Sequence, residues 1–182
     1  MPLIKIPTNQ SELQHALAVS FQDIIDLSAA VSEDKFYAEE NGKWSIGGNV
    51  DHLVMSSLQI VAMTARPKAM FEQFGKAKKP SRSYEELVAT YKEILSKERK
   101  APTDYSPIPG APKSREELLK SIEMLKSKLE KRLPEHWTEE ELDTYRLPHR
   151  AMGMMTMREV LAFTVLDNYH HLEAMERIVI SH

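Results

Sequence analysis

The feature that most constrains the fold is a set of five segments in which apolar residues recur every three or four positions. This spacing gathers apolar side chains on one face of an α-helix, whereas a half-buried strand would alternate at every second residue. The segments extend over about 9–32, 46–67, 83–95, 114–133 and 156–179. No segment is predicted to be a strand. Amphipathic helices must bury their apolar faces against one another, so the pattern predicts an all-α protein.

Helix starts and chain breakers divide these segments. Ser83 and Ser114 each precede a Glu by three residues, which is the pattern of a capping box, and Ser45 is the expected N-cap of 46–67. Pro134 is expected to end the fourth helix. The predicted loops are 76–82, 101–112 and the long connection 138–155. We therefore expect an antiparallel four-helix bundle with a short additional helix or long loops.

Composition limits the class of protein. A chain of 182 residues suits a single helical bundle domain over 1–182. The net charge of −3 argues against a nucleic-acid partner, which usually meets a basic excess. The lack of cysteine excludes disulfides, thiolate metal sites and cysteine nucleophiles. With no signal-peptide core and no apolar run of roughly 18 residues, we expect a cytoplasmic protein without a membrane partner.

A carboxylate and an imidazole lie on the predicted core face of the last helix. Asp167 and His171 are four residues apart, which stacks their side chains on one side of a helix. That face also carries Val160, Phe163, Thr164, Ala174, Met175 and Ile178. A buried polar group without a partner costs about 1–3 kcal/mol. Either a metal ion or a plain hydrogen-bonded pair would satisfy the two groups, and the spacing does not choose between them.

Three further histidines are candidates for the same site. His52 is the natural third ligand, but on a helical wheel it lies more than about 100° from the apolar stripe of its helix, so a surface histidine is the alternative. His170, at the edge of the Asp167 face, could serve as a ligand, a general acid or base, a hydrogen-bond partner or a structural residue. His149 follows Pro148 in the long connection, where it either approaches the site or faces solvent.

The chain resembles a known family at these residues. The segment 44–53, Trp-Ser-Ile-Gly-Gly-Asn-Val-Asp-His-Leu, resembles the second-helix signature of the DinB-like four-helix bundle superfamily, which includes YfiT-like metal-dependent hydrolases and bacillithiol transferases. Residues 148–153 with 156–159 resemble its loop and last-helix start. Residues 167–172 resemble its closing motif, usually His-Asp-x-His-His followed by an apolar residue. The resemblance spans about 10–180.

The resemblance implies three metal ligands on the second and last helices, usually all histidine. Position by position, these fall on His52, Asp167 and His171, so an aspartate stands where relatives generally have a histidine. Gly48 also departs from the family, since many relatives have Glu there. Two imidazoles and one carboxylate suit several divalent metals. We expect zinc or nickel first, with iron or manganese as alternatives.

Two functions follow from the resemblance. One is a metal-dependent thiol-S-transferase or hydrolase acting on a small molecule, such as a thiol, with His170 or His149 moving protons or holding substrate. The other is a non-catalytic stress-response or dimerisation module in which Asp167 bonds His170 or His171 and no metal binds. Dimers are common among relatives, so a homodimer is an expected assembly. The residues do not identify the substrate or decide whether the chain is an enzyme.

Overall fold

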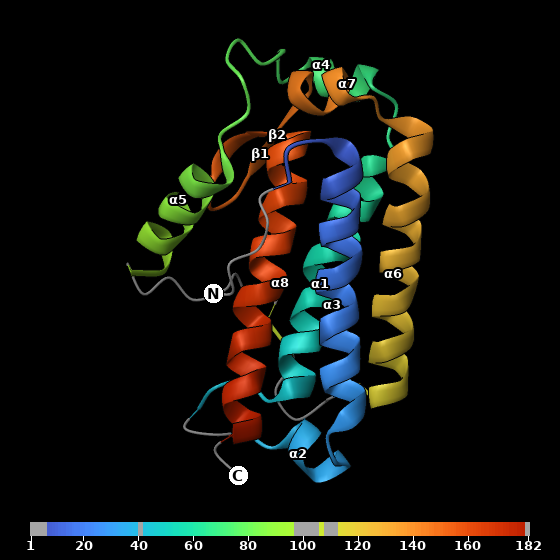
Figure 1. The fold of residues 1–182 in the computed structure, drawn as a ribbon, viewed down its shortest axis with the longest axis vertical. Helices are drawn as coiled ribbons and strands as arrows, with labels where there is room; N and C mark the ends of the chain where they lie inside the picture. The colour runs from blue at the N-terminus through green and yellow to red at the C-terminus, as the bar shows by residue number, and fades with distance from the viewer. Residues whose placement is uncertain (1–6, 40–41, 97–105, 108–112, 181–182) are drawn as a thin grey trace.

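Four long helices form the body of the protein (Figure 1). The structure, a computed structural model, describes residues 7–39, 42–96, 106–107 and 113–180. The bundle consists of α1 (Gln10–Ala30), α3 (Ile46–Thr64), α6 (Arg115–His136) and α8 (Met157–Ile180). This confirms the predicted all-α fold. Most of the predicted loop 101–112 lies outside the described residues.

The helices do not simply alternate in direction. In Figure 1, α1 and α8 run downward, whereas α3 and α6 run upward. The expected antiparallel packing therefore holds for α1 with α6 and for α3 with α8, while α3 packs parallel to α6. The reason is the long connection after α3, which contains α4 (Ala69–Glu72) and α5 (Tyr84–Ser96) and returns the chain to the lower end of the bundle.

One hydrophobic core joins the four helices. The predicted apolar stripes are buried on all of them, which confirms the helical periodicity. The stripes include Leu13, Leu17, Phe21 and Ile24 of α1, Ile46, Val50 and Leu53 of α3, Leu118, Ile122, Leu125 and Leu129 of α6, and Val160, Phe163 and Met175 of α8. A short helix, α2 (Glu33–Tyr37), closes the lower end, where buried Phe36 packs against the start of α3.

The predicted caps are formed. Ser114 and Glu117 make a reciprocal capping box, and Ser83 does the same with Glu86. Ser45 accepts a hydrogen bond from the amide of Gly48 at 3.0 Å. These bonds satisfy N–H groups that have no partner inside the helix, and so they define where α3, α5 and α6 begin.

The prediction that Pro134 ends the fourth helix is wrong, because α6 continues to His136. Proline has no N–H, so the carbonyl of Glu130 one turn earlier loses its intrahelical partner. The side chain of Gln14 in α1 replaces it, donating from Nε2 to the Glu130 oxygen at 2.7 Å. Because a side chain of α1 satisfies this carbonyl, the proline costs the helix less and α6 can continue beyond it.

The connection 138–155 is not a long loop, and the absence of strands was also predicted wrongly. It contains α7 (Glu139–Thr144) and an antiparallel hairpin of β1 (Arg146–His149) and β2 (Gly153–Thr156). Gly153 adopts φ +75, which favours glycine, and it pairs with His149 at the turn. Pro148 is exposed in this two-stranded sheet, where a missing N–H is tolerated.

The hairpin and α5 are held near the upper part of α8. Buried Glu159 accepts hydrogen bonds from the amide and the guanidinium of Arg82, at 2.6 and 3.0 Å, and from the amide of Thr156 at 3.2 Å.

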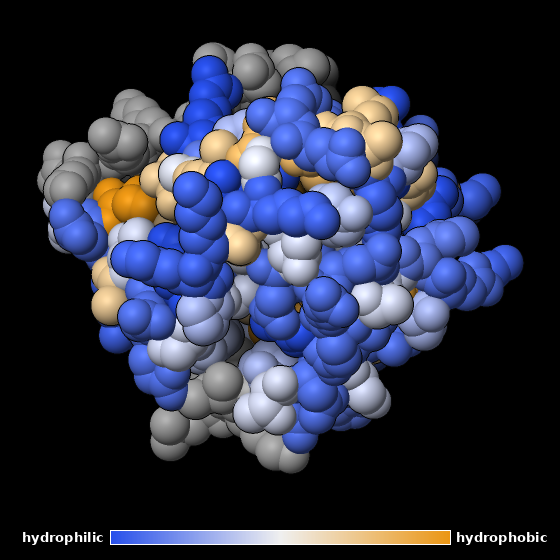
Figure 2. All heavy atoms as spheres, turned by 90° about the horizontal axis from the view of Figure 1, so that it is seen from above, coloured by the Kyte–Doolittle hydropathy of each residue, from blue (hydrophilic) through white to orange (hydrophobic). Residues whose placement is uncertain are grey.

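The end of the bundle that carries α4 and α7 is largely hydrophilic in Figure 2. Across the described part of the chain, no helix combines the length and apolarity that a membrane crossing requires.

Candidate metal centre

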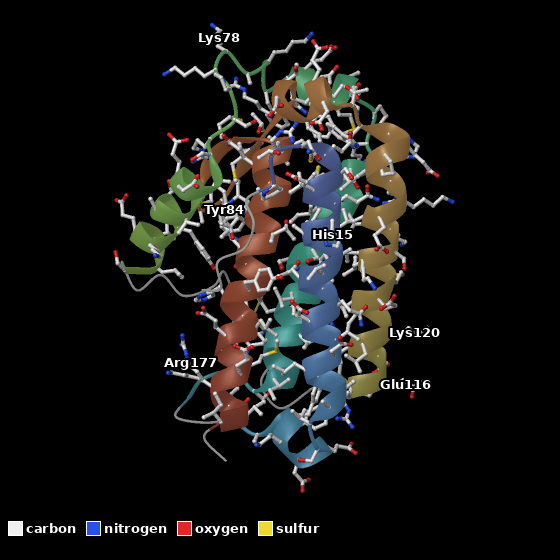
Figure 3. The ribbon with its side chains drawn as sticks, viewed as in Figure 1. His15, Lys78, Tyr84, Glu116, Lys120 and Arg177 are labelled. Carbon is white, nitrogen blue, oxygen red and sulfur yellow. The ribbon has the colours of Figure 1, made fainter. Side chains whose placement is uncertain are left out.

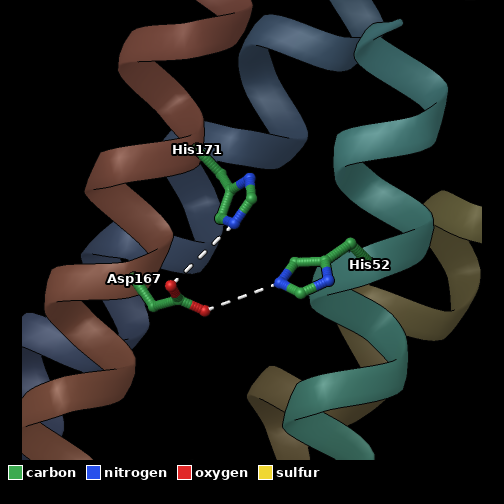
Figure 4. Close-up of side chains that lie close together, drawn as sticks. All are labelled: His52, Asp167 and His171. Atoms are coloured by element: carbon green, nitrogen blue, oxygen red, sulfur yellow. Dashed lines mark ion pairs between the residues drawn. The ribbon is translucent and has the colours of Figure 1, made fainter. Parts of the chain in front are cut away.

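The three predicted ligands come together between α3 and α8 (Figure 4). His52 Nε2 lies 3.8 Å from Asp167 Oδ2, and His171 Nε2 lies 3.9 Å from Asp167 Oδ1. One potential ligand atom of each residue falls within 4.8 Å of those of the other two. His52 is 7% exposed and His171 is 8% exposed. The antiparallel packing of α3 and α8 thus builds a buried group that could hold a metal ion.

The donor set fits a divalent metal. Ligand atoms lie about 2.0–2.2 Å from zinc, so two donors of a tetrahedral site stand about 3.4 Å apart. The two histidine–carboxylate distances, which run to different oxygens of Asp167, exceed that value by about half an ångström, and one donor atom of each residue lies within 4.8 Å of the other two. Small side-chain movements would close this gap. Three protein ligands would also leave a coordination position open.

His171 is held by Asn49, one turn before His52 on α3. The His171 Nδ1 and Asn49 Oδ1 atoms are 2.7 Å apart, and the hydrogen bond is buried. The ring of Trp44 stacks on His171 with a centroid distance of 6.0 Å and an interplanar angle of 11°. Burial, with help from the neighbouring imidazoles of His52 and His170, lowers the pKa of His171 to about 4, and the Asp167 charge only partly opposes them. His171 is therefore neutral near pH 7, as a metal ligand must be.

Asp167 is held by Tyr91 of α5. The Tyr91 hydroxyl donates to Asp167 Oδ1 at 2.6 Å. Burial acts to raise the pKa of Asp167, but the attraction of His52 and His171, which are cationic in the acidic range where this carboxyl titrates, and the Tyr91 hydrogen bond outweigh it and hold that pKa below the usual range. Burial and the adjacent carboxylate raise the pKa of Tyr91, so its hydroxyl keeps its proton. The site therefore contains one carboxylate anion.

The alternative of a surface position for His52 does not hold, because this residue is 7% exposed. Its row on α3 is buried at Asn49 and His52, half-buried at Ser56 and exposed at Gln59. The lower part of α3 packs against α8 as well as α6, and Trp44 also covers it, with its ring centroid 5.0 Å from that of His52. A single apolar stripe cannot describe a helix that has two covered sides.

His170 and His149 flank the trio and do not join it. The His170 ring lies 5.6 Å from that of Tyr91 and 5.2 Å from that of His171. The His149 ring lies 4.8 Å from that of Phe163, which in turn contacts Tyr91. Burial is the main factor lowering the pKa of both flanking histidines, and the Asp167 charge partly offsets it. Both are half-buried.

His149 also has a structural role in the hairpin. Its Nδ1 accepts hydrogen bonds from the amides of Ala151 and Met152, at 3.3 and 3.1 Å. An accepting Nδ1 places the proton of the neutral ring on Nε2. A depression in the described surface is lined by none of these residues. It measures about 300 Å³ and is lined by Lys128, Lys131, Arg132, Glu135 and His136 of α6.

Sequence reasoning missed Asn49 and Tyr91 as members of the site. Asn49 stands on the same row of α3 as His52, so a buried His52 would have implied a buried Asn49. The segment 83–95 was predicted only as an amphipathic helix, and no spacing connects the Tyr91 hydroxyl to residue 167. The Tyr91 contact depends on how α5 packs against α8, which local periodicity does not determine.

The sequence matches a known protein family. The model of a family described as the DinB superfamily matches residues 16–175, which include α3, α6, most of α1 and α8, and the three candidate ligands. A search among curated proteins gives no significant match.

Proposed function

The chain belongs to the DinB superfamily, and on that premise we propose that it is a metal-dependent enzyme acting on a small molecule, by thiol-S-transfer or by hydrolysis. One observation carries the proposal: His52, Asp167 and His171 form a buried donor set between α3 and α8. Buried ionisable groups are costly unless they are paired or coordinate a metal. Two imidazoles and one carboxylate are ligands that zinc and nickel accept, and iron and manganese are the alternatives.

The residues around the donor set support the proposed chemistry. A bound divalent metal lowers the pKa of a thiol or water and so supplies a nucleophile near neutral pH. His170, neutral because its pKa is lowered mainly by burial, is placed to accept a proton. His149 carries its proton on Nε2 when neutral and so is a donor at that atom. We propose these two histidines as the proton-transfer groups.

Elemental analysis of protein purified without an affinity tag tests the metal. We expect about one divalent metal per chain, and its loss in His52→Ala and in His171→Ala. His15→Ala is the matched control, because His15 is an exposed histidine of α1 (Figure 3). Ligand present at a hundred times its Kd would stabilise the fold by about 2.7 kcal/mol. Metal-free protein whose melting temperature does not rise with zinc, nickel or manganese would refute the proposal.

The low exposure of the site supports a second candidate function. Asp167 has a side chain that is 15% exposed, and His52 and His171 are more enclosed still. A substrate would need a way in, so a non-catalytic stress-response or dimerisation module is the alternative. In that case Asp167→Asn changes stability equally with and without added metal. An effect of Asp167→Asn that appears only in the presence of metal favours the enzyme.

The class of partner follows from charge and chemistry. The chain carries a net charge of −3, which supports a small-molecule substrate over nucleic acid. A thiol is the proposed substrate group, because borderline-soft metals bind thiolates well. A panel of small thiols and hydrolysable esters, assayed with the metal-loaded protein and with His52→Ala, distinguishes transferase from hydrolase. Sedimentation at several concentrations tests for the expected homodimer.

A further inference from the structure

Each α8 member of the candidate metal centre is held by a residue outside the donor set. We propose that Asn49 and Tyr91 are positioning residues: Asn49 fixes the tautomer of His171, and Tyr91 fixes the carboxylate of Asp167, before a metal arrives. This inference rests on the proposed metal binding. Residues of this kind commonly orient metal ligands, and replacing them weakens metal affinity or activity by roughly 10- to 100-fold.

The Asn49 amide can take only one orientation at its site. Its Nδ2 lies 2.8 Å from the carbonyl oxygen of Ser45 and 3.3 Å from that of Trp44. Carbonyl oxygens only accept hydrogen bonds, so the NH₂ group must face them. The Asn49 oxygen is then the atom that meets His171 Nδ1, at 2.7 Å.

The orientation of Asn49 decides where His171 carries its proton. An amide oxygen only accepts, so His171 Nδ1 must donate and must be protonated. In the neutral ring the lone pair is then on Nε2, the atom 3.9 Å from Asp167. A ring with the opposite tautomer would present an N–H to the metal position and could not bind there. The hydrogen bonds of Asn49 thus connect the start of α3 to His171 on α8 and leave His171 Nε2 unprotonated, as a metal ligand must be.

Tyr91 acts on the carboxylate in a similar way. Its hydroxyl donates to Asp167 Oδ1 at 2.6 Å, a short charge-assisted hydrogen bond. Asp167 Oδ2 is the oxygen nearer His52, at 3.8 Å. The bond therefore sets the rotation of the carboxylate relative to both histidines. Tyr91 comes from α5, so this helix contributes to the centre although it supplies no predicted ligand.

The histidine tautomer is measured directly by ¹⁵N NMR on the full, metal-free chain near pH 8. We expect His171 as the Nδ1–H form in the wild type and in Asn49→Asp, which keeps an accepting oxygen opposite Nδ1. Asn49→Leu removes that acceptor and should give a mixture of tautomers. Wild-type His171 in the Nε2–H form would overturn the assignment of Asn49, even if both variants fail to fold.

Metal affinity tests both residues in the folded protein, using competition of zinc with a chromophoric chelator. Tyr91→Phe and Asn49→Leu should each weaken zinc binding by roughly 10- to 100-fold. Tyr169→Phe is the matched control: Tyr169 is equally buried, and its hydroxyl donates to the carboxylate of Asp23 on α1 at 3.2 Å. The control should bind zinc as the wild type does.

The outcomes separate this inference from the proposed function. If the wild type binds zinc and Tyr91→Phe binds it equally well, Tyr91 is not a positioning residue, while the metal centre stands. If Tyr169→Phe loses as much affinity as Tyr91→Phe, the effect is a general loss of packing and the inference also fails. If the wild type binds no metal, the proposed function fails, and the inference falls with it.

Discussion

Acidification of the metal-free protein should remove stability through His171. The ordinary pKa of a histidine is 6.5, and burial lowers that of His171 to about 4 in the folded protein. When the pH lies between these two pKa values, His171 binds a proton in the unfolded chain but not in the folded chain. The free energy of unfolding must therefore fall as the pH is lowered through this range.

The magnitude follows from the two pKa values. Each pKa unit corresponds to about 1.36 kcal/mol, so protonation of His171 in the unfolded chain lowers the free energy of unfolding by about 3 kcal/mol in full. Roughly 2 kcal/mol of this loss occurs between about pH 7 and about pH 4.5. His149 and His170 also have lowered pKa values and act in the same direction. Asp167 has a pKa below its usual range, so its contribution is lost only below about pH 4.

Urea unfolding in a chelator, at several pH values, measures this loss. The comparison is with His171→Asn, which is less stable near neutral pH but should lose roughly 2 kcal/mol less on acidification than the wild type. His15→Asn, on the exposed side of α1, should follow the wild type. Parallel pH profiles for the wild type and His171→Asn would show that His171 does not exclude its proton, and the argument from burial would be wrong.

Three changes elsewhere test the packing. Gly47→Ala should destabilise the protein by about 1–3 kcal/mol in thermal unfolding, because a Cβ there would lie 2.8 Å from the buried ring of Phe36; unchanged stability would mean that the ring moves freely. Ser20→Ala should cost about 1–3 kcal/mol, since Ser20 is the partner of the buried Asn168 amide, whose oxygen has no partner among the described residues. Adding Asn168→Leu to Ser20→Ala should recover most of that loss in urea unfolding, and a further loss would contradict this account. Glu159→Ala should cost about 3–5 kcal/mol, because it removes the buried acceptor that joins the start of α8 to the segment before α5; hydrogen exchange in α5 that stays as slow as in the wild type would refute the link.

The four bundle helices could be predicted from the sequence because each has a strong apolar period and a clear start. Asp167 and His171 were found for the same reason: two polar groups on the core face of a helix stand out against its period. The elements that were missed are short. The hairpin contains only four residues in each strand, and Pro148 and Gly153 in it were interpreted as loop residues. Such elements are stabilised by their surroundings more than by their own sequence.

The rest of the site depends on contacts between helices. The burial of His52 follows from the second covered side of α3, and the role of Tyr91 follows from the packing of α5. The end of α6 gives the same lesson, because the helix passes Pro134 where a glutamine of α1 meets the free carbonyl. Local patterns describe one helix at a time, and these features belong to pairs of helices.

The pairing of α3 with α8 also determines when the candidate metal centre can form. The bonded residues His171 and Asn49 are 122 positions apart, so no fragment that ends before α8 contains the site. During synthesis the chain must extend past His171 before His52 can meet its partners. Closing so long a loop has a large entropy cost, which metal binding would help to offset. Metal retention would therefore report that α3 and α8 have docked, and a misassembled chain would be recognisable by its failure to hold the ion.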